Sequence, residues 1–229
     1  MATQIIQIVF ENDQFVICDK PHGVLSTPAR FEDEDRRCLG VELQTMLKMQ
    51  IYPVHRLDYE VSGLVMYAKS AEAHRLANAW FEKKEIQKTY RAWTTKQDFS
   101  HIPDTVFNPR TMINLQKSNK FEWKSKILRG KKRAYESAQG KVSLTLAEFL
   151  EANSEGFLQW NLQPVTGRSH QLRFDLSRQG FPILGDKLYG SSVDYGLEKI
   201  ALRSFKLDFS NCSGAGVLGL PSIIEAFAL

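Results

Sequence analysis

The sequence predicts an α+β fold built as a single catalytic unit. Segments with strand character and segments whose apolar residues follow helical spacing mix irregularly along the chain,. No repeat, low-complexity tract or Pro/Gly/Ser-rich linker divides the 229 residues,. We therefore expect one domain over residues 1–229, organised in one or two lobes.

The first part of the chain is expected to form a β-hairpin, a helix, a strand and a second helix. Apolar runs at 5–10 and 15–19 flank the turn-like residues 11–13,. The charged stretch 31–37 predicts an exposed loop that leads into a helix with apolar residues from Leu39 to Leu47,. Leu64–Ala68 has the composition of a buried strand, and Ser70 is a suitable N-cap for the helix that follows, whose apolar positions are Ala73, Leu76, Ala77, Trp80 and Phe81,.

Three strands and a short helix are expected in the second part. Tyr90–Thr94, Ser143–Leu150 and Phe157–Gln163 have strand character, with a turn at 153–156 between the last two,. Residues 170–179 predict a helix, and Gly180 stands where a left-handed C-terminal cap is expected,.

Composition and charge exclude several classes of protein. No stretch approaches the roughly 20 apolar residues of a membrane span, and the start has no signal-peptide pattern,. Cys18, Cys38 and Cys212 are too few and too widely spaced for a disulfide framework or a zinc site, which favours a reducing compartment,. We expect a cytoplasmic protein, and the net charge of +4 permits a polyanionic partner without requiring one,.

The first segment that can carry chemistry is Pro53–Gly63, which places polar and ionisable side chains directly before an apolar strand,. Asp58 is a candidate nucleophile or general base, Arg56 a candidate phosphate ligand and His55 a candidate proton carrier,. The alternative is a surface loop with a local ion pair between Arg and Asp.

The second segment is Pro164–Arg173, where a strand ends, Gly167 permits a tight turn and a helix begins. Backbone N–H groups at the helix start, together with Arg168 and Arg173, suit an anion. The alternative is an ordinary turn from strand to helix, capped by Ser169 or Thr166.

Together the two segments closely resemble the signature motifs of RluA-type pseudouridine synthases. The first motif is His55-Arg56-Leu57-Asp58 with Ser62-Gly63, and the second is Thr166-Gly167-Arg168-Ser169-His170-Gln171-Leu172-Arg173. Further matching pieces follow in the order of the family: Asp19-Lys20-Pro21 with Gly23, Lys88-Thr89-Tyr90, Gly140-Lys141 with Thr145, and Pro182-Ile183-Leu184-Gly185-Asp186 with Tyr189-Gly190. The resemblance spans roughly residues 8–209.

The resemblance implies an enzyme that isomerises uridine in RNA. Asp58 would be the carboxylate that attacks the uridine, at the pyrimidine ring or at the ribose anomeric carbon, so that the base detaches, rotates and rejoins through carbon,. Arg168 would orient Asp58 by an ion pair, and Tyr90 would pack against the flipped uracil,. Arg56 would fill the space that the flipped base leaves,.

The family fold is a mixed, largely antiparallel bent sheet with flanking helices around a central catalytic cleft. The resemblance implies no metal and no organic cofactor. Some family members carry an N-terminal S4 RNA-binding domain, for which the early hairpin leaves no room. Besides Arg56, the residues expected to bind substrate are His55, Arg173, Lys131, Lys132 and Arg133.

This chain departs from the family pattern at two places. Ala201-Leu202-Arg203-Ser204 stands where the family commonly has Leu-His-Ala. A basic insertion at about 119–139, which includes the three cations Lys131, Lys132 and Arg133, replaces a shorter connection. Its mixture of cations and aromatic rings suits unpaired RNA, and the alternative is a solvated charged hairpin.

Two rival hypotheses remain for the function. One is a noncatalytic RNA-binding protein that keeps the fold, and the other is a hydrolase that uses His55 and Asp58. No nucleophile elbow or metal cluster supports the hydrolase. The substrate would be ribosomal RNA, transfer RNA or both, because Gly23–Pro28 most resembles the small bacterial members that modify a large-subunit ribosomal RNA loop and a transfer-RNA anticodon stem-loop. A monomer is the simplest expectation for one unit of this size.

Overall fold

The computed structural model describes residues 6–28, 36–103 and 110–227, and its contacts divide the chain into two units. Unit 1 comprises Met1–Lys88 and Arg203–Leu229, and unit 2 comprises Thr89–Leu202. Most of the charged stretch 31–37 lies outside the described residues. The expectation of one domain over 1–229 stays a prediction.

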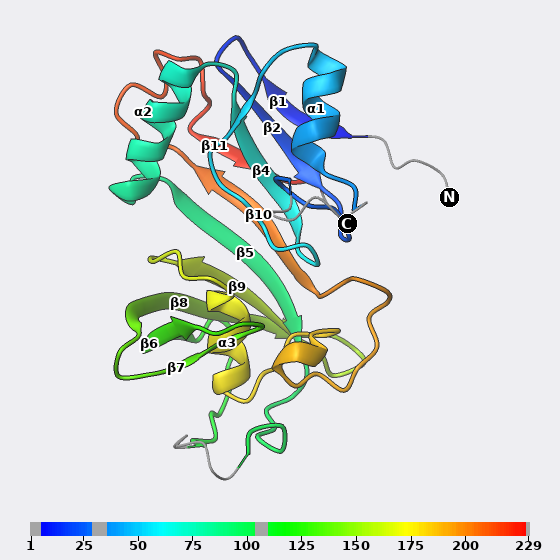
Figure 1. The fold of residues 1–229 in the computed structure, drawn as a ribbon. Coiled ribbons are helices and arrows are strands. Elements are labelled where there is room, and N and C mark those ends of the chain that lie inside the picture. The colour runs from blue at the N-terminus through cyan, green and yellow to red at the C-terminus, as the bar shows by residue number, and fades with distance from the viewer. Residues whose placement is uncertain (1–5, 29–35, 104–109, 228–229) are drawn as a thin grey trace. The chain divides into compact units, whose positions relative to one another are not determined.

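Unit 1 is built on a mixed sheet with the strand order β1-β2-β4-β10 (Figure 1). The pairs β1·β2 and β2·β4 are antiparallel, whereas β10 runs parallel to β4. Two short strands extend the sheet, β3 beside β4 and β11 beside β10. The elements of unit 1 are β1 (Gln7–Glu11), β2 (Phe15–Lys20), α1 (Leu39–Leu47), β3 (Tyr52–Pro53), β4 (Ser62–Ala68), α2 (Ala71–Glu82), β10 (Leu202–Asp208, beginning at the unit boundary) and β11 (Ile223–Glu225).

Local side-chain hydrogen bonds explain two of these elements. The Oδ1 atom of Asn12 accepts from the backbone N–H groups of Gln14 (2.9 Å) and Phe15 (2.8 Å), which closes the turn between β1 and β2,. The hydroxyl of Ser70 accepts from the N–H of Ala73 (3.1 Å) and caps α2,. The predicted hairpin and the predicted N-cap are therefore confirmed.

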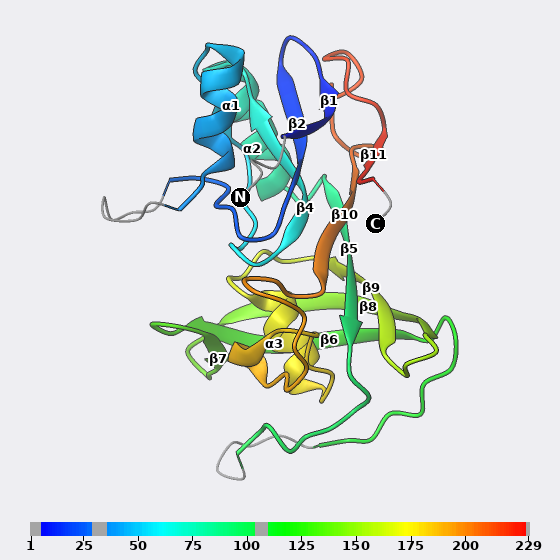
Figure 2. The ribbon, with the colours of Figure 1, turned by 90° about the vertical axis from the view of Figure 1, so that its right-hand side faces the viewer.

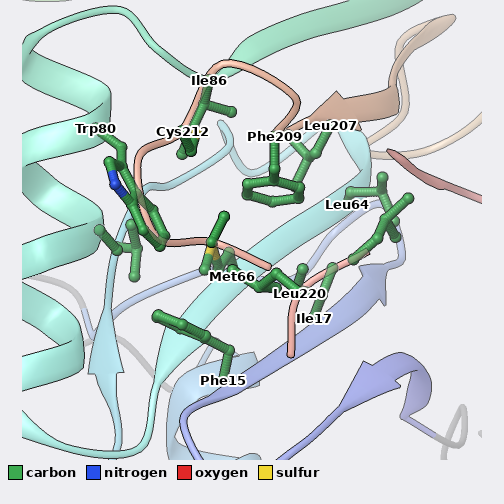
Figure 3. Packing of buried hydrophobic residues seen from close by; sticks show 14 of the residues in the cluster. Phe15, Ile17, Leu64, Met66, Trp80, Ile86, Leu207, Phe209, Cys212 and Leu220 are labelled. Carbon is green, nitrogen blue, oxygen red and sulfur yellow. The ribbon is translucent and has the colours of Figure 1, made fainter. Parts of the chain in front are cut away.

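The core of unit 1 lies between α2 and the sheet. Figure 3 shows Trp80 of α2 beside Phe15 and Met66, which β2 and β4 contribute. The rings of Phe15 and Trp80 have their centroids 6.0 Å apart, and the indole N–H of Trp80 donates to the carbonyl of Ser213 (3.1 Å). Of the apolar positions predicted for α2, Ala73, Ala77 and Trp80 are buried and Phe81 packs partly against the core, whereas Leu76 is exposed,.

Unit 2 contains an antiparallel sheet with the strand order β5-β9-β8-β6-β7 (Figure 2). Helix α3 packs against β6, β8 and β9 and so covers one face of this sheet. The elements are β5 (Gln87–Thr94, beginning just before the unit boundary), β6 (Lys120–Arg129), β7 (Ala134–Glu136), β8 (Lys141–Ala152), β9 (Leu158–Pro164), α3 (Gln171–Arg178) and the single turn of 3-10 helix η1 (Lys187–Tyr189).

Trp160 of β9 is the centre of the core of unit 2. Its ring lies against four other aromatic rings at centroid distances between 4.9 and 6.1 Å, those of Phe121, Trp123, Phe149 and Phe181. Its indole N–H donates to the hydroxyl of Thr94 (3.0 Å), so the one polar atom of this buried ring has a partner,.

The predicted strands and the predicted helix of the second part are all present. Asn153 closes the expected turn, since its Oδ1 atom accepts from the N–H groups of Glu155 and Phe157. Gly180 adopts a φ of +82° just after α3, as expected of a left-handed cap,. The fold is therefore of the α+β class, and its strand pairs are largely antiparallel. None of the described helices combines the length and the apolar character that a membrane span requires.

Candidate active site

Asp58 lies in the loop between β3 and β4 of unit 1 and is half-buried. Its carbonyl accepts from the N–H of Val61 (3.2 Å), which turns the chain into β4. Leu57 and Val61 on either side are buried in unit 1. The loop is thus anchored by apolar side chains while the carboxylate of Asp58 lies nearer the surface.

Lys20, the last residue of β2, binds the backbone of this loop through its side chain. Its side chain is fully buried, and its Nζ atom donates to the carbonyls of Pro21 (2.9 Å), Val24 (2.7 Å) and Tyr59 (3.3 Å). An ammonium group has three N–H donors, so three carbonyls satisfy it completely. Lys20 therefore ties the backbone next to Asp58 to the end of β2.

The loop after β2 makes three further attachments around Asp58. The hydroxyl of Ser26 donates to the carbonyl of Leu57 (3.1 Å) and accepts from its N–H (3.0 Å). The N–H of Gly23 donates to the carbonyl of Tyr59 (3.0 Å), and Nδ1 of His22 lies 2.7 Å from the carbonyl of Glu60. Backbone groups at positions 57, 59 and 60 are thus fixed, which leaves little freedom at position 58.

The electrostatics of this site centre on a buried cation. Burial lowers the pKa of Lys20 to about 7, and the negative charges of Asp58 and Glu60 act in the opposite direction,. The carboxylate of Asp58 is therefore part of the field that favours the protonated form of Lys20. Above that pH the neutral amine has only two N–H groups for three carbonyls.

Arg203, one of the residues singled out in the sequence, lies in β10 and joins three parts of unit 1. Its guanidinium forms an ion pair with Asp19 and donates to Ser62 Oγ (3.3 Å) and to the carbonyl of Phe227 (3.1 Å). Asp19 lies next to the end of β2, and Ser62 begins β4. Arg203 therefore links the end of β2 to the start of β4, and the loop that carries Asp58 is attached at both places.

Gly63 permits the close approach of β4 and β10. A Cβ atom at this position would lie 2.2 Å from the carbonyl oxygen of Ser204, and the residue has a φ of +106°. Both the space and the backbone conformation therefore require glycine here. This explains the Ser-Gly pair of the first motif in physical terms.

His55 has a structural position in unit 1. Its Nε2 atom accepts from the N–H of Met66 (3.2 Å), and its ring lies 5.0 Å from the ring of Phe81. Burial, and then the charge of Lys88, lowers the pKa of His55 to about 3,. So weak a base is a poor proton acceptor, which argues against the hydrolase hypothesis, and the role of His55 in substrate binding stays a prediction.

Arg56, the next residue, is exposed. Within the described part of the chain it makes no hydrogen bond and no ion pair. Its guanidinium is thus available for an external partner, as the hypothesis of a residue that replaces the flipped base requires.

Tyr90 and Arg168 both lie in unit 2. Tyr90 is half-buried in β5, opposite Leu162 of β9. Arg168 lies in the turn between β9 and α3, where its Nε atom donates to the carbonyl of Val142 (2.9 Å). The ion pair expected between Arg168 and Asp58 joins residues of different units and belongs to the proposal below.

The start of α3 differs from the capped turn considered as an alternative. The N-cap residue is His170, in a left-handed conformation with a φ of +54°, and its side chain caps no N–H group. Its Nδ1 atom lies 3.1 Å from the hydroxyl of Tyr189. Neither Ser169 nor Thr166 is the cap, because Ser169 bonds to Arg129 and Thr166 accepts from the N–H of Leu144.

Arg173 lies inside unit 2 rather than at a surface. It is 3% exposed and forms a bidentate ion pair with Asp186, with Nε–Oδ2 and Nη2–Oδ1 distances of 2.7 and 2.8 Å. Its guanidinium also lies 5.3 Å from the ring centroid of Tyr189. A buried guanidinium with a buried partner cannot reach a phosphate, so we assign Arg173 to the core and not to RNA binding.

The stretch at 119–139 forms strands β6 and β7 and the turn that joins them. Gly130 N–H donates to the carbonyl of Arg133 (2.9 Å) to close this turn. Lys131, Lys132 and Arg133 are exposed at its tip. We call residues 120–136 the basic hairpin. The geometry fits both a solvated hairpin and a hairpin that binds RNA.

Metal-binding and thiol chemistry find no support in the described residues. Among them, no group of three or more His, Cys, Asp or Glu side chains is arranged to hold a metal ion. All three cysteines are buried, and burial raises the pKa of Cys18 to about 12,. His22 bonds to a carbonyl, and His74 stacks on Tyr52 at 5.6 Å.

Three residues of the sites were given no role from the sequence, although two of them stand in the motifs. Lys20 was visible as a charged residue that ends an apolar run, but its three carbonyl partners depend on the tertiary fold. Gln171 and Asp175 are buried polar residues of α3 that bond to β8. Their signal was a polar residue on the buried face of a predicted helix.

A family model described as RNA pseudouridylate synthase matches residues 14–178. The protein named dual-specificity RNA pseudouridine synthase RluA of Pasteurella multocida is 32% identical over 205 residues, which cover 89% of this chain and 86% of that protein. The ribosomal large subunit pseudouridine synthase D of Borreliella burgdorferi is 32% identical over 213 residues, which cover 89% of this chain and 60% of that protein.

The chain spans about three fifths of the length of two of the curated relatives that it matches, at 61% and 60%. Among solved structures, human RNA pseudouridylate synthase domain containing 1 superposes with a TM-score of 0.68 at 22% identity, over 98% of this chain and 90% of that chain. This likeness shows the fold.

Proposed function

Since the chain belongs to the family of RNA pseudouridylate synthases, we propose that it converts uridine in RNA to pseudouridine with Asp58 as the catalytic carboxylate. The observation that carries the proposal is the fixed loop around Asp58. Lys20, Ser26, Gly23 and His22 bind the backbone at positions 57, 59 and 60 and leave the Asp58 side chain half-buried. The backbone that carries the carboxylate is thus in place before the substrate arrives.

The reaction breaks the bond between N1 of uracil and C1′ of ribose and forms a bond between C5 and C1′. Asp58 attacks either the ring or C1′, remains bonded while the base rotates, and leaves when C5 has joined C1′. The proton on C5 is lost and N1 gains a proton, so the product is an isomer of the substrate. No redox step and no co-reactant are needed.

The other assigned residues support this step. The role proposed for Arg168 is to orient the carboxylate of Asp58 by an ion pair. Tyr90 packs against the uracil, and Arg56 occupies the place that the base leaves in the RNA stack. Arg56 is exposed, as this role requires.

The substrate we propose is a stem-loop of ribosomal RNA, transfer RNA or both. Support comes from the names of two relatives, one a dual-specificity RNA pseudouridine synthase and the other a ribosomal large subunit synthase. We further propose that the enzyme acts as a cytoplasmic monomer and that residues 1–229 work as one catalytic domain.

Pseudouridine mapping of total RNA tests the function. Cells that lack the gene are complemented with the wild type, with Asp58→Asn, or with Asp13→Asn as the control. Asp13 is an exposed carboxylate in the turn between β1 and β2, far along the chain from the loop. We expect one or a few sites to be restored by the wild type and by Asp13→Asn but not by Asp58→Asn. Full restoration by Asp58→Asn would refute the role of Asp58, and no change at any site in cells that lack the gene would favour the noncatalytic RNA-binding protein.

The basic hairpin is proposed as the main electrostatic contact with RNA outside the site of reaction. Changing Lys131, Lys132 and Arg133 to Ala removes three exposed positive charges. Each phosphate contact contributes roughly 0.7–0.9 to the slope of log K against log salt concentration, so the slope should fall by about 2–3.

The matched control for the hairpin removes three other exposed positive charges, those of Arg75, Lys83 and Lys96. It changes the net charge equally and should leave the slope unchanged. Equal effects of the two triple variants on RNA affinity would assign binding to net charge and reject the hairpin contact.

A further inference from the structure

The side chain of Gln171, the first residue of α3, is 4% exposed and uses all of its hydrogen-bonding capacity. Its Oε1 atom accepts from the backbone N–H of Arg168 (3.0 Å) and from the hydroxyl of Thr166 (2.7 Å). Its Nε2 atom donates to the carbonyl of Leu144 (3.0 Å) and to the hydroxyl of Thr145 (2.9 Å). An amide offers two acceptor sites and two N–H donors, so none is left over.

The orientation of this amide is dictated by its neighbours. The carbonyl of Leu144 can only accept, and the N–H of Arg168 can only donate, so the nitrogen must face β8 and the oxygen must face the turn. The hydroxyl of Thr166 accepts from the N–H of Leu144 (3.0 Å), which leaves its own proton for Gln171. Gln171 therefore joins the backbone of Arg168 to β8, beside the bond that Thr166 makes to Leu144.

A carboxylate completes the network on the far side of Gln171. The hydroxyl of Thr145 accepts from Gln171 and donates to Oδ2 of Asp175 (2.7 Å), while Ser125 of β6 donates to Oδ1 (3.4 Å). Asp175 is 2% exposed, and the charged groups that act on it are Arg178 of α3 and Glu136 of β7. The network thus links β6, β8 and α3 to the turn.

We propose that Gln171 is a positioning residue that acts through Arg168. Its amide fixes the backbone of Arg168, and the bond from Arg168 Nε to the carbonyl of Val142 then directs the guanidinium. This inference rests on the proposed function, in which Arg168 orients the catalytic carboxylate. Gln171 affects the reaction only through Arg168 and does not need to contact the RNA.

The variant Gln171→Met tests the proposal because methionine has a similar length and no donor or acceptor of comparable strength. We expect kcat to fall by roughly 10- to 100-fold, since a shift of about 1 Å in a positioning group can have that effect. The dissociation constant for RNA should change by less than about twofold, because Gln171 is buried. Gln171→Glu keeps an acceptor for the N–H of Arg168 and should retain more activity than Gln171→Met.

Activity is measured as tritium release from total RNA of cells that lack the gene, labelled with tritium at C5 of uridine. The decisive measurement is a double-mutant cycle with Arg168→Lys. If Gln171 acts through Arg168, the double variant should be no slower than Arg168→Lys alone. Gln163→Met, an exposed glutamine at the end of β9, is the control and should match the wild type.

The possible outcomes separate this inference from the proposed function. Independent, multiplicative losses in the cycle would overturn the positioning role, as would full activity of Gln171→Met. Unfolding of both Gln171→Met and Gln171→Glu at the assay temperature would assign Gln171 to stability alone and would also overturn it. If the folded wild type released no tritium, the proposed function would fail first, and the inference would fall with it.

Discussion

Removing the guanidinium of Arg173 should destabilise the protein without weakening its affinity for RNA. The ion pair between Arg173 and Asp186 is buried, with exposed fractions of 3% and 1%, and both of its N–O distances are below 3 Å. The variant Arg173→Met leaves the carboxylate of Asp186 buried without its cation, which costs about 3–5 kcal/mol. In a chain of this length each kcal/mol lowers Tm by about 2–4 °C, so Tm should fall by about 6–20 °C.

Thermal unfolding at pH 7, followed by circular dichroism, measures this fall. The control is Arg178→Met, which breaks the more exposed ion pair with Glu136 and should cost less than about 1 kcal/mol,. A second comparison is the double variant Arg173→Met with Asp186→Leu. It removes both charges and should recover much of the lost stability, because a buried pair replaced by apolar groups is often neutral.

RNA binding supplies the result that would refute this reasoning. If Arg173→Met kept its Tm within about 3 °C of the wild type but reduced both RNA affinity and the salt slope, Arg173 would be a phosphate ligand. Its burial against Asp186 and Tyr189 would then not describe the state that binds RNA.

Two further predictions concern stability. Gly63→Ala should lower the free energy of unfolding by at least ~3 kcal/mol, because its Cβ would overlap the backbone of Ser204 at a φ of +106°, whereas Gly216→Ala, with open space around it, should be nearly neutral in urea titrations,. Burial raises the pKa of Asp175 to about 7, so its protonated form contributes stability at low pH that is lost as the pH rises from about 4 through 7,. Asp175→Asn lacks this loss, so its Tm relative to the wild type should rise between pH 4.5 and 8, and parallel curves would contradict the prediction.

The sequence predicted the elements whose signals are local. The apolar run before Ser70 predicted β4, and Ser70 with the apolar spacing after it predicted α2,. These signals are local because all the contacts that they require lie within a few residues. Strands β6, β7 and β10 were not predicted as strands, although β6 and β10 have 10 and 7 residues. The short strands β3 and β11 were also missed, since two or three residues carry no periodic pattern,. They exist because β4 and β10 offer an edge to pair with.

In the candidate site, too, the sequence identified the residues that stand in motifs but not the contacts that depend on the tertiary fold. Asp58, Arg56, Tyr90 and Arg168 were named from motifs, and the structure leaves their roles as proposals. Arg173 was misassigned to RNA binding because its place in the motif says nothing of Asp186, thirteen residues further along the chain. An arginine in a functional motif can bind a phosphate of the substrate or form a buried ion pair in the core, and the burial of its side chain distinguishes the two roles.

Arg203 illustrates how a departure from the family pattern is accommodated. Asp19 is 6% exposed, and its carboxylate needs a permanent positive partner at that depth,. Arginine supplies one at every physiological pH, whereas a histidine is mostly neutral near pH 7 unless its pKa is raised. The guanidinium also spans the distance from Asp19 to Ser62 and to the carbonyl of Phe227, which one imidazole with two ring nitrogens cannot do,. In this chain Arg203 therefore joins the ends of the two strands that carry the Asp58 loop, through its ion pair with Asp19 and its bond to Ser62.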